Sequence, residues 1–113
     1  MRETRVYLED ILESIKRIER YIKDLKTADF IENEVVQDGV MKRMEVIGEA
    51  VKHLPDNIKN KYPEIPWKNI AGIRDVLIHE YAGVQLETIW RTAKNDLPTL
   101  KQTIVQLLNG KKS

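Results

Sequence analysis

The sequence predicts an all-α fold, a four- to five-helix up-and-down bundle. Apolar residues recur at three- and four-residue steps along most of the chain, as in helices with one buried face. No segment alternates apolar and polar residues as a half-buried strand does. The connections between helical segments are short, which favours antiparallel neighbours. A length of 113 residues predicts one domain, residues 1–113.

Composition limits the classes of function. Charged residues make up 33% and apolar residues 42%, as in soluble folded domains. The net charge of +1 provides no strong basic field for nucleic acid. Residues 1–38 hold 7 basic and 10 acidic side chains, whereas residues 39–113 hold 12 and 8. A polyanion is therefore expected to prefer the later part.

Three features favour the cytoplasm and no membrane segment. The chain has no cysteine, which excludes disulfides and thiolate metal sites. It is charged from its second residue, unlike a signal peptide. No apolar run approaches the roughly 20 residues that span a bilayer.

The first helix is expected at residues 4–26. Its single apolar stripe predicts core packing rather than a partner surface. Glu19 and Lys23 are four residues apart and should pair on the exposed face. Thr27 can cap the short turn that follows. The stripe comprises Leu8, Ile11, Leu12, Ile15, Ile18, Ile22 and Leu25.

The second long helix is expected at residues 34–53, with Asn33 as its cap. Gly48 inside it predicts close approach of a neighbouring helix. Pro55 ends the helix and leaves His53 in its last turn, where an imidazolium suits the helix dipole. A capping role for His53 is a better interpretation than catalysis.

The later chain is expected to form shorter helices. The prolines of "PDNIKNKYPEIP" leave room only for a turn at residues 57–61. Pro66 suits the start of the next helix, which Gly83 is expected to end.

The last two helices are predicted around a proline. One covers residues 85–95, and Asp96 can cap a final segment that Pro98 opens and Gly110 ends.

The segment "RDVLIHEY", residues 74–81, contains more charged and polar side chains than a core helix needs. On a helix, Asp75 and His79 share one face and Arg74 and Tyr81 another, whereas Arg74 and His79 are about 140° apart. One continuous helix therefore cannot direct Arg74 and His79 at the same atom. Either the helix ends near His79, or two copies face each other and share one cleft.

These residue types match metal-independent RNA cleavage. His79 would handle the proton of the ribose 2′-hydroxyl or of the leaving group, and Arg74 would hold the phosphate. Asp75 could orient His79, and Tyr81 could bind a phosphate oxygen or stack on a base. The alternative is a surface ion-pair patch with His79 at a helix end. Composition and spacing alone favour that patch.

The stretch "IAGIRDVLIHEYAGV" resembles the HepT branch of the HEPN superfamily. The motif of that branch is Arg, four to six residues, His, one residue and Tyr, which Arg74, His79 and Tyr81 fill. The stretches "MKRMEVIGEAVKHLP" (residues 41–55) and "YPEIPWKNI" (residues 62–70) are similar to the same family.

This resemblance spans roughly residues 35–108 and implies a HEPN-like homodimer with paired Arg/His motifs at the interface. It implies a ribonuclease toxin from a two-gene toxin–antitoxin module, with RNA as substrate. The antitoxin would be a cognate minimal nucleotidyltransferase that can transfer AMP to Tyr81. Asp75 stands where such proteins often have Asn, and its added charge could weaken RNA binding.

Three residues of the second long helix have further interpretations. Glu45 and Glu49 are four apart, a spacing that can hold a divalent ion. Without a second acidic pair, solvated or internally paired carboxylates are the better interpretation, and no metal or cofactor is expected. Arg43 could add phosphate affinity near the cleft, and a plain surface role is about as well supported.

Two other functions stay open at this point. The chain could be a non-catalytic helical subunit that binds a minimal nucleotidyltransferase, or a plain interaction bundle. RNA cleavage that is lost on changing His79 would separate the ribonuclease from the binding subunit.

Overall fold

The computed structural model describes residues 2–79 and 86–110, with all of their side chains except those at positions 2, 74, 76, 78 and 79. In these two ranges the chain is helical apart from short connections and contains no strand, which confirms the all-α prediction. No helix in the same ranges is long and apolar enough to cross a membrane. The helices are α1 (Arg2–Ile22), α2 (Thr27–Ile31), α3 (Glu34–Lys52), α4 (Asp56–Lys61), α5 (Trp67–His79), α6 (Leu86–Arg91) and α7 (Leu97–Leu108).

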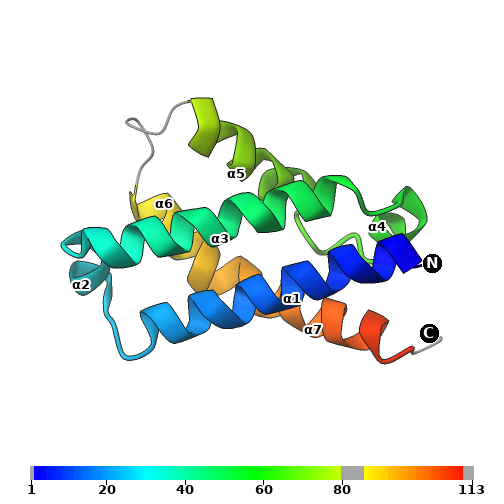
Figure 1. Cartoon of the computed structure of the whole chain (residues 1–113), viewed down its shortest axis with the longest axis horizontal. Coiled ribbons are helices and arrows are strands. Elements are labelled where there is room, and N and C mark those ends of the chain that lie inside the picture. The colour runs from blue at the N-terminus through cyan, green and yellow to red at the C-terminus, as the bar shows by residue number, and fades with distance from the viewer. Residues whose placement is uncertain (1, 80–85, 111–113) are drawn as a thin grey trace.

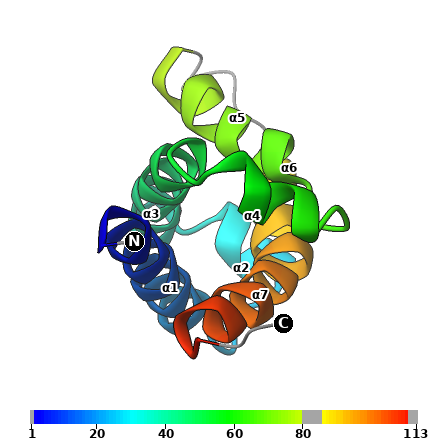
Figure 2. The ribbon, with the colours of Figure 1, turned by 90° about the vertical axis from the view of Figure 1, so that its right-hand side faces the viewer.

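Two long antiparallel helices, α1 and α3, lie side by side and pack against each other (Figure 1). The helix α7 packs against α1, and α5 packs against α3. The helices α2 and α6 contact each other at the end of the bundle opposite the chain termini (Figure 1). Seen along the bundle, α5 lies at its outer edge (Figure 2). The helix that carries the motif is therefore held mainly by α3.

The predicted apolar stripes of the first two long helices face the core, which confirms their assignment. Fully buried side chains include Ile11, Ile15 and Ile18 of α1 and Val40, Ile47 and Val51 of α3. The two helices also approach closely at Gly39, where an added Cβ would lie 3.1 Å from the Tyr21 ring. Gly48, expected at a close approach, is buried as well.

The ends of α1, α2 and α3 agree only in part with prediction. Asn33 caps α3 as expected, because its Oδ1 accepts from the Val36 N–H at 3.0 Å. The first helix ends earlier than predicted, and Asp24 follows it with a left-handed φ of 67°. Thr27 is the first residue of α2 and not its cap. The carboxylate of Asp29 instead accepts from the Lys26 N–H at 2.9 Å.

The expected pairing of Glu19 within its own helix is replaced by a contact between helices. Both Glu19 oxygens accept from Nζ of Lys101 on α7, at 2.9 and 3.2 Å. The spacing to Lys23 indicated a possible partner, but the packing of α7 on α1 brings a closer cation.

The predicted helix boundary at Asp96 is wrong. The chain passes from α6 through a π-helical turn, Thr92–Asp96, directly into α7. Asp96 has helical dihedrals and makes no cap with its side chain. The N–H of Leu97 donates to the carbonyl of Thr92, five residues earlier. Pro98 has no N–H and its ring crowds the preceding turn, so a widened turn lets the helix continue.

Candidate functional site

Arg74 and His79 of the motif belong to α5, whose beginning is fixed by a tryptophan. The indole N–H of Trp67 donates to the carbonyls of Lys59 and Tyr62, at 3.1 and 3.0 Å. These acceptors lie at the end of α4 and just after it, so Trp67 joins the two helices. The inner face of α5 is apolar, with Ile70 and Leu77 each 2% exposed. Its first turn and its buried face thus set how α5 lies on α3.

The residues Arg74, Asp75 and His79 all belong to this one helix, as predicted. Helical geometry separates positions 74 and 79 by about 140° around the axis. The side chains of Arg74 and His79 lie outside the described part of the chain. So do Tyr81 and the expected helix end at Gly83. The shared two-chain cleft therefore stays a prediction.

Asp75 connects the motif helix to α3. Its Oδ1 lies 3.9 Å from Nζ of Lys52, in the last turn of α3. The two side chains are 55% and 44% exposed, so the pair lies at the surface. The charge that Asp75 brings to the motif is therefore next to a cation from another helix.

Arg43 lies on a different side of α3. Its guanidinium donates to Oγ of Ser14 on α1 at 3.5 Å, and Ser14 is only 1% exposed. Positions 43 and 52 are roughly 180° apart around a helix. Within one chain, Arg43 thus faces α1, whereas Lys52 faces α5. The expected phosphate contact of Arg43 stays a prediction.

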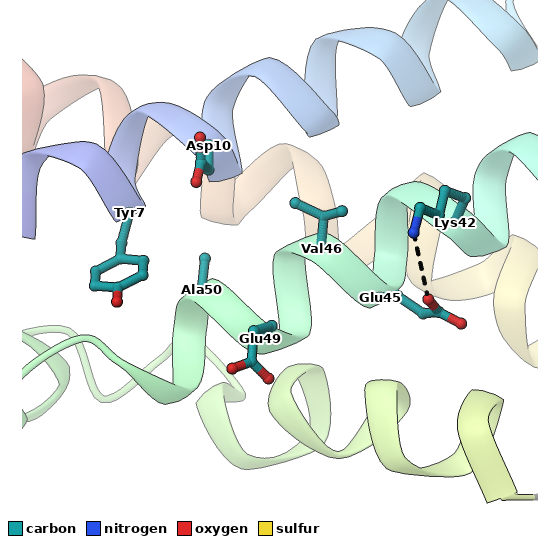
Figure 3. Close-up of a pocket in the computed structure, with 7 residues that line it drawn as sticks. All are labelled: Tyr7, Asp10, Lys42, Glu45, Val46, Glu49 and Ala50. Carbon is teal, nitrogen blue, oxygen red and sulfur yellow. Dashed lines mark ion pairs between the residues drawn. The ribbon is translucent and has the colours of Figure 1, made fainter.

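A groove of about 280 Å³ lies beside α3 (Figure 3). Its charged groups include Glu45, which pairs with Lys42 at 4.0 Å. Figure 3 shows Glu45 and Glu49 on the side of α3 that faces α5. Among the described residues, no three His, Asp or Glu side chains are grouped as metal ligands would be. The lining residues are Tyr7, Asp10, Lys42, Glu45, Val46, Glu49 and Ala50.

His53 has the capping position expected for it. It is the C-cap residue of α3, and its Nδ1–H donates to the carbonyl of Glu49 at 2.9 Å. Its ring also stacks on Tyr7 of α1, with centroids 4.7 Å apart and planes inclined by 17°. These contacts give His53 a role in joining α3 to α1.

Sequence reasoning missed two of these residues, Lys52 and Tyr7. Lys52 falls inside the block at residues 41–55 that resembles the HepT branch, but nothing in its spacing indicates Asp75 as a partner. Tyr7 precedes the apolar stripe of its helix and offers no sequence signal for a stack on His53.

Comparison with known proteins supports the same family. Residues 11–107 match the family described as "Ribonuclease HepT-like". The chain is 44% identical over 95 residues to "Probable ribonuclease HepT" of Thermococcus cleftensis, covering 84% of this chain and 86% of that protein. It is 42% identical over 113 residues to "Putative RNase MJ1216" of Methanocaldococcus jannaschii, covering 97% and 93%.

A longer relative matches only in part. The chain is 45% identical over 107 residues to "Gamma-glutamylcyclotransferase and putative RNase MJ0434" of Methanocaldococcus jannaschii. This match covers 95% of the chain and 48% of that protein, so the chain spans about half of its length. No solved structure matches the chain. With a family match across most of its residues and two relatives above 40% identity that it covers almost entirely, the chain belongs to the HepT-like ribonuclease family.

Proposed function

We propose that this chain is the endoribonuclease toxin of a two-gene toxin–antitoxin module and that it cleaves RNA without a metal ion. The family match carries the proposal, because residues 11–107 include the whole of the Arg74, His79 and Tyr81 motif. The relatives named as RNases support the same enzyme class for this chain.

The proposed reaction uses only the chemistry of the motif. The ribose 2′-hydroxyl loses its proton, its oxygen attacks the adjacent phosphorus, and the bond from phosphorus to the 5′-oxygen breaks. His79 moves the proton at the 2′-hydroxyl or at the leaving oxygen. The guanidinium of Arg74 binds the phosphate and stabilises its developing negative charge.

The active unit in this proposal is a two-fold dimer. Positions 74 and 79 belong to one helix and are about 140° apart around its axis, so we do not expect one chain to direct both residues at one phosphate. A two-fold axis beside α5 would bring the arginine of one copy toward the histidine of the other. The position of α5 at the outer edge of the bundle leaves room for this arrangement (Figure 2).

Regulation is proposed to act through Tyr81. A partner minimal nucleotidyltransferase would transfer AMP to the phenol oxygen and release pyrophosphate from ATP. The new phosphodiester would occupy Arg74 and the adenosine would fill the cleft. The partner must supply the metal-bound triphosphate and the base, because an unassisted phenol is a weak nucleophile.

The test is RNA cleavage by the isolated protein in EDTA. The parent protein should cut RNA and His79→Ala should not, because the general acid–base is lost. The chain contains only two histidines, so His53→Ala is the matched control and should cut at the parent rate. A folded parent that does not cut RNA but still binds a nucleotidyltransferase would instead support the non-catalytic subunit.

A further inference from the structure

We propose that the outward face of α5, near the start of the helix, binds the RNA strand next to the cleavage site. This α5 surface consists of Lys68, Asn69 and Gly72. The proposal rests on the ribonuclease function proposed above and adds to it a substrate contact outside the motif.

The three residues of the α5 surface lie on the side of the helix that faces away from the core. Lys68 and Asn69 are within about 60° of Gly72 around the helix axis. Both are exposed, whereas Ile70 and Leu77, on the opposite side, are each 2% exposed. Because α5 lies at the outer edge of the bundle (Figure 2), a large ligand can reach this surface.

Packing within the chain does not explain Gly72. It lies inside a helix, where glycine is less favourable than alanine. A Cβ added at Gly39 would lie 3.1 Å from the Tyr21 ring, so that glycine lets α1 and α3 pack closely. A Cβ added at Gly72 would meet no described atom within 4 Å. A glycine on an open helix face lets a ligand lie directly against the backbone.

The polar groups of the α5 surface suit a nucleic acid. Among the described residues, Lys68 has no ion-pair partner. Its ammonium can bind a phosphate and release the counterions of the RNA. The amide of Asn69 can donate to a phosphate oxygen or to a base edge. Asp75 borders the same side of the helix, next to Lys52, and is not part of the surface because its charge would repel a phosphate.

The α5 surface is continuous with the motif along the helix. Position 79 comes seven residues after Gly72 on α5, about 20° away around the axis and about 10.5 Å further along it. A strand bound at Lys68 and Gly72 can therefore reach position 79 without passing to another side of α5. This continuity favours RNA over another protein as the ligand.

The first experiment measures RNA affinity at several salt concentrations. Kd is obtained by fluorescence anisotropy with a labelled single-stranded 2′-O-methyl RNA, which the proposed reaction cannot cleave. Lys68→Gln should weaken binding about fivefold, the effect of one unit charge close to water. The slope of log affinity against log salt should become shallower by about 0.7, the value for one lost phosphate contact to a single strand.

The matched control for charge is Lys16→Gln. Lys16 is also exposed and, like Lys68, has no ion-pair partner among the described residues, but it belongs to α1. The change in net charge is the same, so Kd and the salt slope should stay close to those of the parent.

The second experiment changes the backbone contact at Gly72. Gly72→Leu should weaken RNA binding about tenfold, because its side chain would stand where the strand lies against the helix. Gly72→Ala should raise the melting temperature, since alanine favours the helix, and should still weaken binding. Thr88→Leu adds a leucine to an exposed position of α6 and should leave Kd unchanged.

Three results would overturn the proposal. The first is a parent-like Kd for Lys68→Gln or for Gly72→Leu. The second is an equal loss of affinity in Lys16→Gln, which would assign the effect to net charge. The third is a change of oligomeric state in Gly72→Leu by light scattering, which would assign the open face to a second copy of the chain.

Cleavage of unmodified RNA separates this proposal from the proposed function. If the parent binds RNA through the α5 surface but does not cut it, the ribonuclease is refuted and the surface stands. If the parent cuts RNA and the Lys68 and Gly72 variants bind and cut equally well, only the surface is refuted. A parent that neither binds nor cuts RNA refutes both.

Discussion

His53 stacks on Tyr7 with ring centroids 4.7 Å apart, and this contact joins the end of α3 to the first turns of α1. The same histidine donates from Nδ1 to the carbonyl of Glu49 in its own last turn. It satisfies one of the carbonyls that a helix end leaves without an intrahelical partner. Of the two histidines in the chain, this one has a structural explanation that needs no catalysis.

His53→Ala should therefore lower the free energy of unfolding and leave RNA cleavage unchanged. The loss should be about 1–2 kcal/mol, from the ring stack and one hydrogen bond. Urea denaturation followed by circular dichroism measures it. Tyr7→Leu removes the stack but keeps the hydrogen bond, so its loss should be smaller. A large fall in cleavage by a well-folded His53→Ala protein would contradict this assignment.

Arg74→Lys should abolish RNA cleavage although it keeps the positive charge. An ammonium lacks the planar fork that binds two phosphate oxygens at once. Initial rates on a labelled RNA measure the effect. Arg17→Lys is the matched control, since Arg17 pairs with Glu13 on α1 at 3.0 Å and should tolerate the change. If Arg74→Lys cleaved RNA at the parent rate, the mechanism would not require a planar guanidinium at this position.

Gln37→Leu should destabilise the end of the bundle where α2 meets α3. The buried amide of Gln37 donates to the carbonyls of Phe30 and Ile31, both at 2.9 Å. Leucine would remove the amide donor from both carbonyls, and although the Phe30 carbonyl keeps the Asn33 N–H at 3.2 Å, the loss should cost about 1–3 kcal/mol. Thermal unfolding measures the loss. Lys26→Gln, an exposed change near the same helix, should have little effect, and equal melting of the two variants would disprove the role of Gln37.

The helices could be predicted from the sequence because their signals are local. The steps between Ile11, Ile15 and Ile18 fix which face of α1 is buried, and all three are buried. The π-helical turn before Pro98 could not be predicted, because a proline is equally consistent with a helix start. Apolar spacing predicts helices on both sides of this turn, but it does not show that α6 runs through a π-helical turn into α7.

The site could be predicted only along its own helix. Arg74, Asp75 and His79 were assigned to one helix, and α5 contains all three. The contact between Lys52 and Asp75 depends on how α5 lies across α3, which no periodicity encodes. The same limit applies to Arg43, because α3 has α1 on one side and α5 on another.

Coexpression with the partner nucleotidyltransferase should add AMP to Tyr81. Peptide mass spectrometry should show the peptide that contains Tyr81 heavier by one or more AMP units, and Tyr81→Phe should stay unmodified. Tyr7, Tyr21 and Tyr62, the other tyrosines of the chain, serve as internal controls and should not change. An unmodified Tyr81 in protein that an active partner has neutralised would refute the proposal and favour a packing role for this tyrosine.

Mixing two inactive variants should restore RNA cleavage if the cleft is shared by two chains. In a mixed dimer of Arg74→Ala and His79→Ala, one cleft loses both groups and the other keeps both. The intact cleft takes its arginine from the His79→Ala chain and its histidine from the Arg74→Ala chain. Because each homodimer lacks one group in both clefts, neither should cut RNA alone. Differently tagged chains are coexpressed, purified through both tags and sized by light scattering, and the mixed dimer should recover up to about half of the parent rate per dimer. If each cleft instead belonged to one chain, every chain would still lack a group and the mixed dimer would stay inactive. A monomeric parent that cuts RNA would rule out the shared cleft altogether.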